Sequence, residues 1–262
     1  MRTNSLRSQL GSGKPVIGTM IEEISSPFIV HVLANAGYDF VFVDMEHGRF
    51  GQEGAANLIQ TVRLTSMTCL VRVPDNQYHL IARILDAGAE GIMVPRISTQ
   101  QEVEAVVQYA RYPPIGQRGL SVTRGHNNYE RGETQTFTQH ANRENLVIIQ
   151  IERREAVEDI DSLLSVPGVD VALIGPVDLS ISLGLPLDFS HPDIEKAIQR
   201  VVNACQRHNV IAGMHTSNLK ALSYWHQRGI LMLTSSSELD MLIDSSKALA
   251  HAMREMVRTG NT

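Results

Sequence analysis

Short apolar runs alternate with longer amphipathic segments along the chain. Eight of these short runs are rich in β-branched residues, and they span 15–21, 40–46, 69–74, 91–97, 146–152, 169–175, 210–216 and 229–235. Continuous apolar runs of this length are typical of parallel strands that are buried on both faces. The pattern therefore predicts eight parallel strands.

The segments between most of these runs have helical periodicity, as in "SSPFIVHVLANAG" and "TQQEVEAVVQYARY". Several end at a glycine just before the next strand, in "NAGYDF", "DAGAEG" and "QRGILM", which is typical of a helix C-terminus. Eight strand–helix repeats in 262 residues predict an α/β fold, a (β/α)8 barrel formed by residues 1–262 as a single domain. An open doubly wound sheet is the structural alternative, but no GxGxxG motif follows the first predicted strand.

Residues 112–145 interrupt this alternation. The segment "YPPIGQRGLSVTRGHNNYERGETQTFTQHANREN" is long and polar, and such excursions are typically lids, binding loops or subunit contacts. Its basic residues Arg124, His126 and Arg131 are compatible with a solvated loop or a subunit contact.

The composition narrows the class of protein. With 43% hydrophobic residues, 19% charged residues and a net charge of −5, the chain is typical of a globular protein. No basic block indicates nucleic acid or an anionic membrane surface as a partner. Cys69 and Cys205 lack CxxC spacing, so we interpret both as reduced packing residues. The first fifteen residues lack the apolar core of a signal peptide, and no run approaches the ~20 residues of a membrane span, so we expect a cytoplasmic protein.

Polar residues follow the apolar runs at the points where the strands end. In "FVFVDMEHGRF", the second run stops abruptly at Asp44, Glu46 and His47. The other strand ends supply Arg72, Arg96, Gln150, Glu152, Asp178, His215, Ser235 and Ser236. Because active sites of barrels form at the carboxyl ends of the strands, this convergence predicts one shared pocket.

These residue types suggest metal-assisted acid–base chemistry. Glu152 and Asp178 are hard oxygen ligands that suit Mg²⁺ or Mn²⁺ and leave positions for a chelating substrate. His47 is a candidate acid or base near neutral pH, oriented by a carboxylate such as Asp44. Arg72 is a candidate for binding a carboxylate and stabilising an enolate.

Each of these residues also has a structural interpretation when it is taken alone. Asp44 is a candidate turn former, Glu152 lies where a carboxylate favours a helix dipole, and Asp178 is a candidate helix cap. His47 and Arg72 have ordinary roles as a structural histidine and an ion-pair residue. His215 and Arg96 are more readily interpreted as structural or peripheral than as catalytic, and Ser235 and Ser236 as caps of the last helix or as anion-binding backbone.

The motifs together resemble those of a known family. "VFVDMEHGRF", "CLVRVP", "GAEGIMVPRI", "YPPIGQRG", "IIQIER" and "VDVALIGPVDLSISLG" are similar to the HpcH/HpaI class II pyruvate aldolases, over roughly residues 10–255. The resemblance implies a (β/α)8 barrel of the phosphoenolpyruvate/pyruvate type. It also implies a homo-oligomer, a hexamer built as a trimer of dimers, in which the last helix is often exchanged between subunits.

The resemblance also implies roles for individual residues. The metal ligands match Glu152 and Asp178, and the catalytic residues match His47, Asp44 and Arg72, with Glu46 beside them in a second layer. The residues matched to the substrate-binding side are Gln150, Arg72, Met20 and Ser180. Met20 lies close to a position where several relatives have tryptophan, so the pocket wall is softer and has room for a bulkier donor such as hydroxypyruvate.

The reaction implied by the family is reversible cleavage of a 4-hydroxy-2-oxo acid to pyruvate, or a close analogue, and an aldehyde. With this reaction, Arg124, His126 and Arg131 of the 112–145 segment become candidate contacts to an acidic aldehyde, beside their interpretation as a solvated loop or subunit contact. The cofactor implied is a divalent ion, Mg²⁺, Mn²⁺ or Co²⁺, which stabilises the enolate. None of the eight predicted strand ends carries a lysine for the Schiff-base route. The alternatives are another metal–enolate lyase, acting on acyl-CoA thioesters or decarboxylating oxaloacetate, and a non-catalytic barrel subunit.

Overall fold

A computed structural model describes residues 2–259. Within these residues, eight parallel strands form a closed barrel in chain order, with the last strand paired to the first. The strands are β1 (Val16–Ile21), β2 (Phe40–Asp44), β3 (Thr68–Arg72), β4 (Gly91–Val94), β5 (Leu146–Ile151), β6 (Val171–Ile174), β7 (Ile211–His215) and β8 (Met232–Ser237). The predicted (β/α)8 barrel is confirmed. Residue 1 and residues 260–262 of the predicted domain lie outside the described residues.

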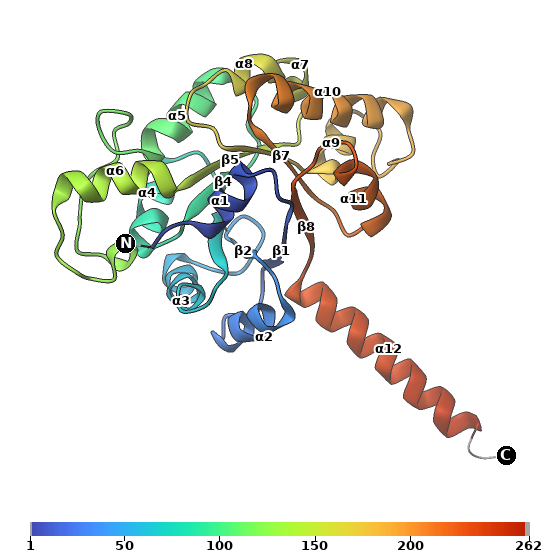
Figure 1. Ribbon diagram of the computed structural model, residues 1–262. Coiled ribbons are helices and arrows are strands. Elements are labelled where there is room, and N and C mark those ends of the chain that lie inside the picture. Colours follow the sequence, from blue (N-terminus) through green and yellow to red (C-terminus); the bar gives the residue numbers. More distant parts are fainter. Residues whose placement is uncertain (1, 260–262) are drawn as a thin grey trace.

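Helices cover the outside of the barrel (Figure 1). They are α1 (Ser5–Gly11), α2 (Phe28–Ala36), α3 (Gln52–Val62), α4 (Tyr78–Ala87), α5 (Gln100–Ala110), α6 (Thr134–Glu144), α7 (Arg154–Glu158), α8 (Ile160–Leu164), α9 (Pro176–Ser182), α10 (Pro192–His208), α11 (Leu219–His226) and α12 (Glu238–Thr259), with a 3₁₀ turn, η1 (Gly125–Asn127). The apolar pattern did not predict α1, whose buried residues Leu6 and Leu10 join the cluster inside the barrel.

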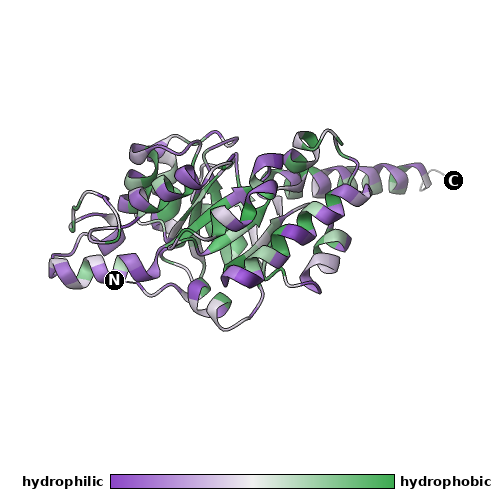
Figure 2. Cartoon of the chain, turned by 90° about the horizontal axis from the view of Figure 1, so that it is seen from above, coloured by the Kyte–Doolittle hydropathy of each residue, from purple (hydrophilic) through white to green (hydrophobic). Residues whose placement is uncertain are grey.

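The two faces of each strand explain why the runs are continuously apolar. In β2, Phe40 and Phe42 point into the barrel, whereas Val41 and Val43 pack against the helices. Figure 2 shows these hydrophobic strands at the centre of the chain, among helices with mixed faces. Gly18 on β1 lies opposite Phe40, and a Cβ at that glycine would lie 2.4 Å from the phenylalanine ring. The glycine therefore makes room for an aromatic layer inside the barrel.

The bounds of the last strand differ from the prediction at both ends. The apolar run predicts a strand at residues 229–235, but β8 spans Met232–Ser237. Gly229 has a φ of 112°, a conformation that favours glycine, and it lies in the turn after α11. The apolar residues Ile230 and Leu231 therefore lead into the strand rather than forming it, and the strand continues through polar serines to the helix that follows.

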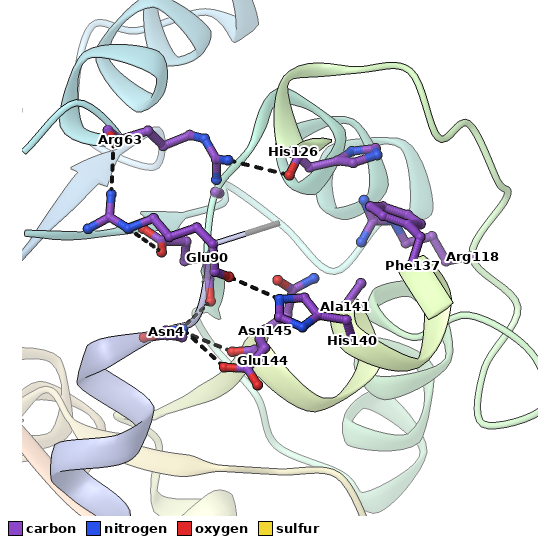
Figure 3. Close-up of a pocket in the computed structure, with 12 residues that line it drawn as sticks. Asn4, Arg63, Glu90, Arg118, His126, Phe137, His140, Ala141, Glu144 and Asn145 are labelled. Carbon is purple, nitrogen blue, oxygen red and sulfur yellow. Dashed lines mark hydrogen bonds and ion pairs between the residues drawn. The ribbon is translucent and has the colours of Figure 1, made fainter. Parts of the chain in front are cut away.

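The excursion at residues 112–145 packs against the amino-terminal end of the barrel (Figure 3). Asn4 donates hydrogen bonds to the carbonyl groups of Glu90 and Glu144, which precede β4 and β5. The guanidinium of Arg63 donates to the carbonyl oxygen of His126 at 3.4 Å. Within one chain, Arg124, His126 and Arg131 therefore belong to a segment at the end of the barrel opposite to the carboxyl ends of the strands. This placement does not support the interpretation of these three residues as aldehyde contacts.

A neutral imidazole holds part of this excursion in place. His126 stacks on Phe137 of α6 with 4.7 Å between the ring centroids. Burial, together with the charge of Arg118, lowers the pKa of His126 to about 4. The ring is therefore uncharged near neutral pH, as its apolar partner requires. Separately, among residues 2–259, no helix is long and apolar enough to cross a membrane.

Candidate active site

The carboxyl ends of β2, β4, β5 and β6 surround a cavity of about 380 Å³. Its lining residues are Glu46, His47, Arg96, Glu152, Arg153, Glu155, Asp178, Ile181 and Ser182. The cavity brings together five of the polar strand-end residues that the sequence singled out. The predicted polar residues at these strand ends therefore do converge at the barrel mouth.

Asp44 and Arg72 form a buried pair at the ends of two neighbouring strands. Arg72 donates from Nε to Oδ1 of Asp44 at 2.8 Å and from a terminal nitrogen to Oδ2 at 2.5 Å. Burial alone would raise the pKa of Asp44, but the hydrogen bonds and charge of Arg72 outweigh burial and hold that pKa below its usual range. The register that places Asp44 beside Arg72 is the ordinary parallel pairing of β2 and β3.

Glu46 joins this pair to the next strand end. Its carboxylate lies 3.3 Å from Arg72 and 3.6 Å from the side chain of Arg96. Its backbone N–H donates to Oδ1 of Asp44 at 2.9 Å, which fixes the turn after β2. Burial raises the pKa of Glu46, although the charges of Arg72 and His47 oppose this rise.

His47 lines the cavity, but its ring makes no hydrogen bond to Asp44 among the described residues. The carboxylate of Asp44 accepts instead from Arg72 and from the Glu46 backbone. Asp44 therefore acts on the histidine through charge, since the two groups interact electrostatically. The predicted pairing of His47 with Asp44 is therefore electrostatic: Asp44 holds Arg72 by hydrogen bonds and lies near the histidine.

Glu152 is held at the end of β5 by two donors. The backbone N–H of Arg96 donates to Oε1 at 2.6 Å, and the side-chain amide of Gln150 donates to the other oxygen. Burial raises the pKa of Glu152 to about 7, and the nearby carboxylates of Glu46 and Asp178 add to this rise. An acidic group surrounded by other acidic groups in a buried site favours a cation there.

The donor set fits a divalent metal ion. Within residues 2–259, no group of three or more His, Cys, Asp or Glu residues could hold a metal ion by itself. Glu152 and Asp178 nevertheless line one cavity, so two carboxylates are available, and water or a chelating substrate can complete a six-coordinate shell. Oε1 of Gln150 is buried and has no hydrogen-bond partner among the described residues, so the site contains an unused acceptor beside these ligands.

The backbone of Arg96 was not predicted to contribute. Arg96 has a φ of 58°, which is uncommon for a residue with a side chain, and this conformation directs its N–H to Glu152. The sequence marked only its side chain, because backbone conformation at a strand end is not visible in an apolar pattern. Strained residues that orient a functional group are common at active sites.

The structure places the remaining predicted residues away from the cavity lining. Ser180 is fully buried, and its hydroxyl donates to the carbonyl of Val177 and accepts from Leu187 N–H, so the fold uses its hydrogen bonds. Met20 lies in the apolar cluster inside the barrel. His215 is half-buried at the end of β7, and burial lowers its pKa to about 4, so it is a neutral imidazole near Arg72.

Glu22 and Glu238 are carboxylates near the mouth that the pattern of strand ends does not predict. Burial raises the pKa of Glu22, which lies close to Asp44 and Arg72 in the turn after β1. Glu238 is almost fully buried and accepts hydrogen bonds from that same turn. The only sequence signal for either residue is an acidic side chain next to an apolar run, which also describes many solvated helix ends.

Comparison with known proteins gives consistent matches. The family model described as HpcH/HpaI aldolase/citrate lyase matches residues 22–245. A 2-keto-3-deoxy-L-rhamnonate aldolase of Klebsiella pneumoniae is 32% identical over 213 residues, covering 80% of this chain and 78% of the relative. A hydroxypyruvate/pyruvate aldolase of Paraburkholderia phytofirmans is 27% identical over 258 residues, covering 96% and 98%.

A solved structure matches the whole barrel. The HpcH/HpaI aldolase from Desulfitobacterium hafniense superposes with a TM-score of 0.92 at 31% identity, covering 97% of this chain and 98% of that one. The fold and the resemblance drawn from the motifs are therefore confirmed, and the chain is a carbon–carbon lyase of the aldolase type. The chain belongs to the HpcH/HpaI aldolase/citrate lyase family.

Proposed function

We propose that the cavity at the barrel mouth cleaves a 4-hydroxy-2-oxo acid to pyruvate, or a close analogue such as hydroxypyruvate, and an aldehyde. The observation that carries this proposal is the placement of Glu152, Asp178 and His47 around one cavity beside the buried Asp44–Arg72 pair. Relatives named as aldolases of keto-deoxy sugar acids and of hydroxypyruvate and pyruvate support the substrate class.

Glu152 and Asp178 would hold a divalent ion, Mg²⁺, Mn²⁺ or Co²⁺, in this cavity. A bound divalent ion supplies Lewis-acid polarisation of the 2-oxo group and neutralises the charge that develops there. Gln150 supports this site because its amide orients Glu152 and its own oxygen remains available to the ligand shell. The Arg96 N–H keeps the second oxygen of Glu152 in place.

Residues at the ends of β2 and β3 would stabilise the charge that develops on the substrate and would accept its proton. Arg72 is almost fully buried at the end of β3, so in this low-dielectric setting its guanidinium would stabilise the enolate oxygen as charge develops there. Asp44 holds the guanidinium plane in one orientation through its two hydrogen bonds. His47 lies on the cavity wall and would remove the proton from the C4 hydroxyl as the carbon–carbon bond breaks.

The test is pyruvate release from a panel of 4-hydroxy-2-oxo acids, with EDTA-treated protein and added Mg²⁺, Mn²⁺ or Co²⁺. We expect release only with metal. His47→Ala should lower aldol cleavage by about 10²–10⁴-fold, the usual effect of losing an acid–base group. It should change oxaloacetate decarboxylation much less, because that reaction has no C4 hydroxyl proton to remove.

His79, an exposed histidine of α4, provides the matched control as His79→Ala. Equal losses in both reactions on His47→Ala would refute the proton-transfer role of this residue. Absence of pyruvate release from every acid with metal bound would refute the aldolase activity at this site. Turnover of an acyl-CoA thioester instead would assign the site to the other lyase chemistry.

We further propose that the chain works as a homo-oligomer built through α12, a trimer of dimers as the resemblance implies. This helix projects away from the barrel (Figure 1), and only its first residue is buried. Its exposed apolar residues are Leu242, Ile243, Leu249, Met253, Met256 and Val257. On the barrel, Ile17 of β1 is 47% exposed, so part of the outer barrel wall lacks a covering helix. Exposed apolar side chains repeated along a helix that has so little contact with its own barrel are typical of an interface.

Leu249→Glu should therefore reduce the assembly to smaller species, measured by light scattering after size exclusion, because a charge replaces an apolar side chain in the interface. Lys247→Glu on the same helix is the matched control and should leave the mass unchanged. A wild-type chain that is monomeric at micromolar concentration would contradict the proposal.

A further inference from the structure

Glu238 forms an unusual contact at the root of α12. Although it is the first residue of that helix, it is only 3% exposed. Its carboxylate accepts hydrogen bonds from three successive backbone N–H groups of the turn after β1. These donors are Glu22 at 2.9 and 3.0 Å, Glu23 at 2.6 Å and Ile24 at 2.8 Å. A carboxylate that satisfies three backbone donors is a strong local constraint.

The end of β8 is distorted in a way that directs Glu238 to this turn. The pairing of β8 with β1 shifts register between Gly18 and Met20, as in a β-bulge. Ser236 has a φ of 61°, and its carbonyl accepts a hydrogen bond from the Thr19 hydroxyl at 3.0 Å. Bulges redirect side chains, and a strained residue persists only where its surroundings determine it. We therefore interpret the bulge and the left-handed Ser236 as the features that direct the Glu238 carboxylate to this turn.

The turn that Glu238 holds lies directly against the segment that carries His47. The carbonyl of Glu22 accepts a hydrogen bond from the Arg49 N–H at 3.0 Å. A Cβ on Gly48 would lie 2.2 Å from the carbonyl oxygen of Asp44 and 2.9 Å from that of Glu22. The turn after β1 and the segment after β2 are thus packed backbone to backbone, so a displacement of the first moves the second.

We propose that Glu238 is a positioning residue for the aldol reaction: it fixes the turn at residues 22–24 and, through that turn, the segment 45–49 that carries Glu46 and His47. This inference rests on the proposed function only for its kinetic consequence. The clamp, by which we mean the hydrogen bonds from the N–H groups of residues 22–24 to the Glu238 carboxylate, is a property of the fold. Glu238 is also the first residue of α12, the helix that projects from the barrel. It therefore connects this helix to the turn that packs against the His47 segment.

A simpler role for Glu238 is to stabilise the N-terminus of α12 by its charge. Acidic residues in the first turn of a helix favour the helix dipole, and Asp240 also lies in this turn. In that case, loss of the charge would loosen α12 and leave the turn after β1 unchanged. The two roles are therefore distinguished by where the backbone becomes less protected.

Hydrogen exchange of the full-length protein tests the clamp without any substrate. Oε1 of Glu238 accepts from all three N–H groups and Oε2 only from that of Glu22. In Glu238→Gln, the remaining oxygen is a neutral and weaker acceptor, and the NH₂ group that replaces Oε2 is a donor facing the Glu22 N–H. The amides of residues 22–24 should exchange about tenfold faster or more, while those of β2 to β6 remain as in the wild type. Asp244→Asn, an exposed carboxylate on the same helix, is the matched control and should change nothing.

Kinetics test the consequence for the reaction. Glu238→Gln should lower kcat for aldol cleavage about tenfold or more, because a small displacement of a reacting group is costly. The KM for the 2-oxo acid and the affinity for Mn²⁺ should stay within about twofold, because Glu152 directly follows β5 and Asp178 lies on α9, and neither belongs to this turn. If Glu238→Gln does not fold, Glu238→Asp takes its place, since its shorter carboxylate cannot reach all three donors.

Unchanged exchange at residues 22–24, or exchange that rises only within α12, would overturn the clamp. Faster exchange with unchanged kcat would overturn its role in positioning His47. A wild-type protein without aldolase activity would refute the proposed function instead, and the exchange measurement would still decide whether the clamp exists.

Discussion

Glu152→Gln and Asp178→Asn are each expected to lower metal-dependent turnover by at least about 10³-fold, because each removes one of two carboxylates available for the cation. Both variants keep the size of the side chain, so the cavity remains. We expect the affinity for Mn²⁺ to fall by 10–100-fold or more, measured by calorimetry. Full activity of either variant, or of the wild type in EDTA, would contradict the assignment.

Glu155→Gln is the matched control for these two variants. Glu155 lines the same cavity, but it is an exposed residue in the first turn of α7. If its loss were as harmful as that of Glu152, the effect would come from the general negative potential of the mouth rather than from a specific ligand. We expect turnover of Glu155→Gln to stay within about threefold of the wild type, in line with an exposed charge.

Glu152 also gives the metal-free protein a distinctive pH dependence. Burial and the neighbouring carboxylates raise its pKa to about 7 in the folded chain, above the ordinary glutamate value. Below the ordinary glutamate pKa, Glu152 is protonated in both the folded and the unfolded chain, so its ionisation does not change the free energy of unfolding. As the pH rises toward 7, the unfolded chain loses its proton first, so the free energy of unfolding falls, by about 1–3 kcal/mol in total.

Glu152→Gln removes this ionisation. The metal-free variant should therefore be at least as stable as the metal-free wild type at pH 8, measured by urea unfolding, although it has lost activity. Added Mn²⁺ should raise the midpoint of the wild type and leave that of the variant almost unchanged. A variant that is strongly destabilised at pH 8 would show that Glu152 serves the fold rather than the metal.

The fold could be predicted because each strand is buried on both sides. Phe40 and Val41 face different environments, but both are apolar, so the run is continuous and easy to recognise. The bounds predicted for the eighth strand are wrong because Ile230 and Leu231 are apolar residues of a connection, whereas the strand itself extends through the polar Ser236 and Ser237. Apolarity locates a buried segment but does not distinguish a strand from the residues that lead into it.

Only those site residues that directly follow a predicted strand could be predicted from the sequence. Glu152 and Asp178 follow apolar runs, and the barrel architecture then brings them to one cavity. Ser180 stands in the same motif as Asp178, yet its hydroxyl is used within the fold. The contribution of Glu238 depends on a bulge and on the left-handed conformation of Ser236, and neither has a signature in the pattern of residues.

Arg72→Leu is expected to be the most damaging single change, because it affects both stability and catalysis. It leaves the carboxylate of Asp44 fully buried and without its charged partner. Removing one member of a buried ion pair typically costs about 3–5 kcal/mol. The free energy of unfolding should fall by this amount, measured with urea at pH 7.5, and aldol cleavage should fall below detection.

The double variant Arg72→Leu/Asp44→Leu separates these two effects. It removes both charges, so the uncompensated carboxylate is gone, and most of the lost stability should return. Activity should not return, because the guanidinium proposed to stabilise the enolate is still missing. Recovery of activity in the double variant would show that Arg72 serves only to neutralise Asp44.

Arg72→Lys provides the sharper measurement of the arginine's role in catalysis. Lysine keeps the positive charge near Asp44, but it cannot reproduce the two parallel hydrogen bonds that hold the guanidinium plane. We expect a moderate loss of stability together with a fall in kcat of about 10²–10³-fold, since a charge that is free to move stabilises the developing enolate less well. If Arg72→Lys retained wild-type kcat, the charge alone would suffice, and the orientation imposed by Asp44 would have no part in the reaction.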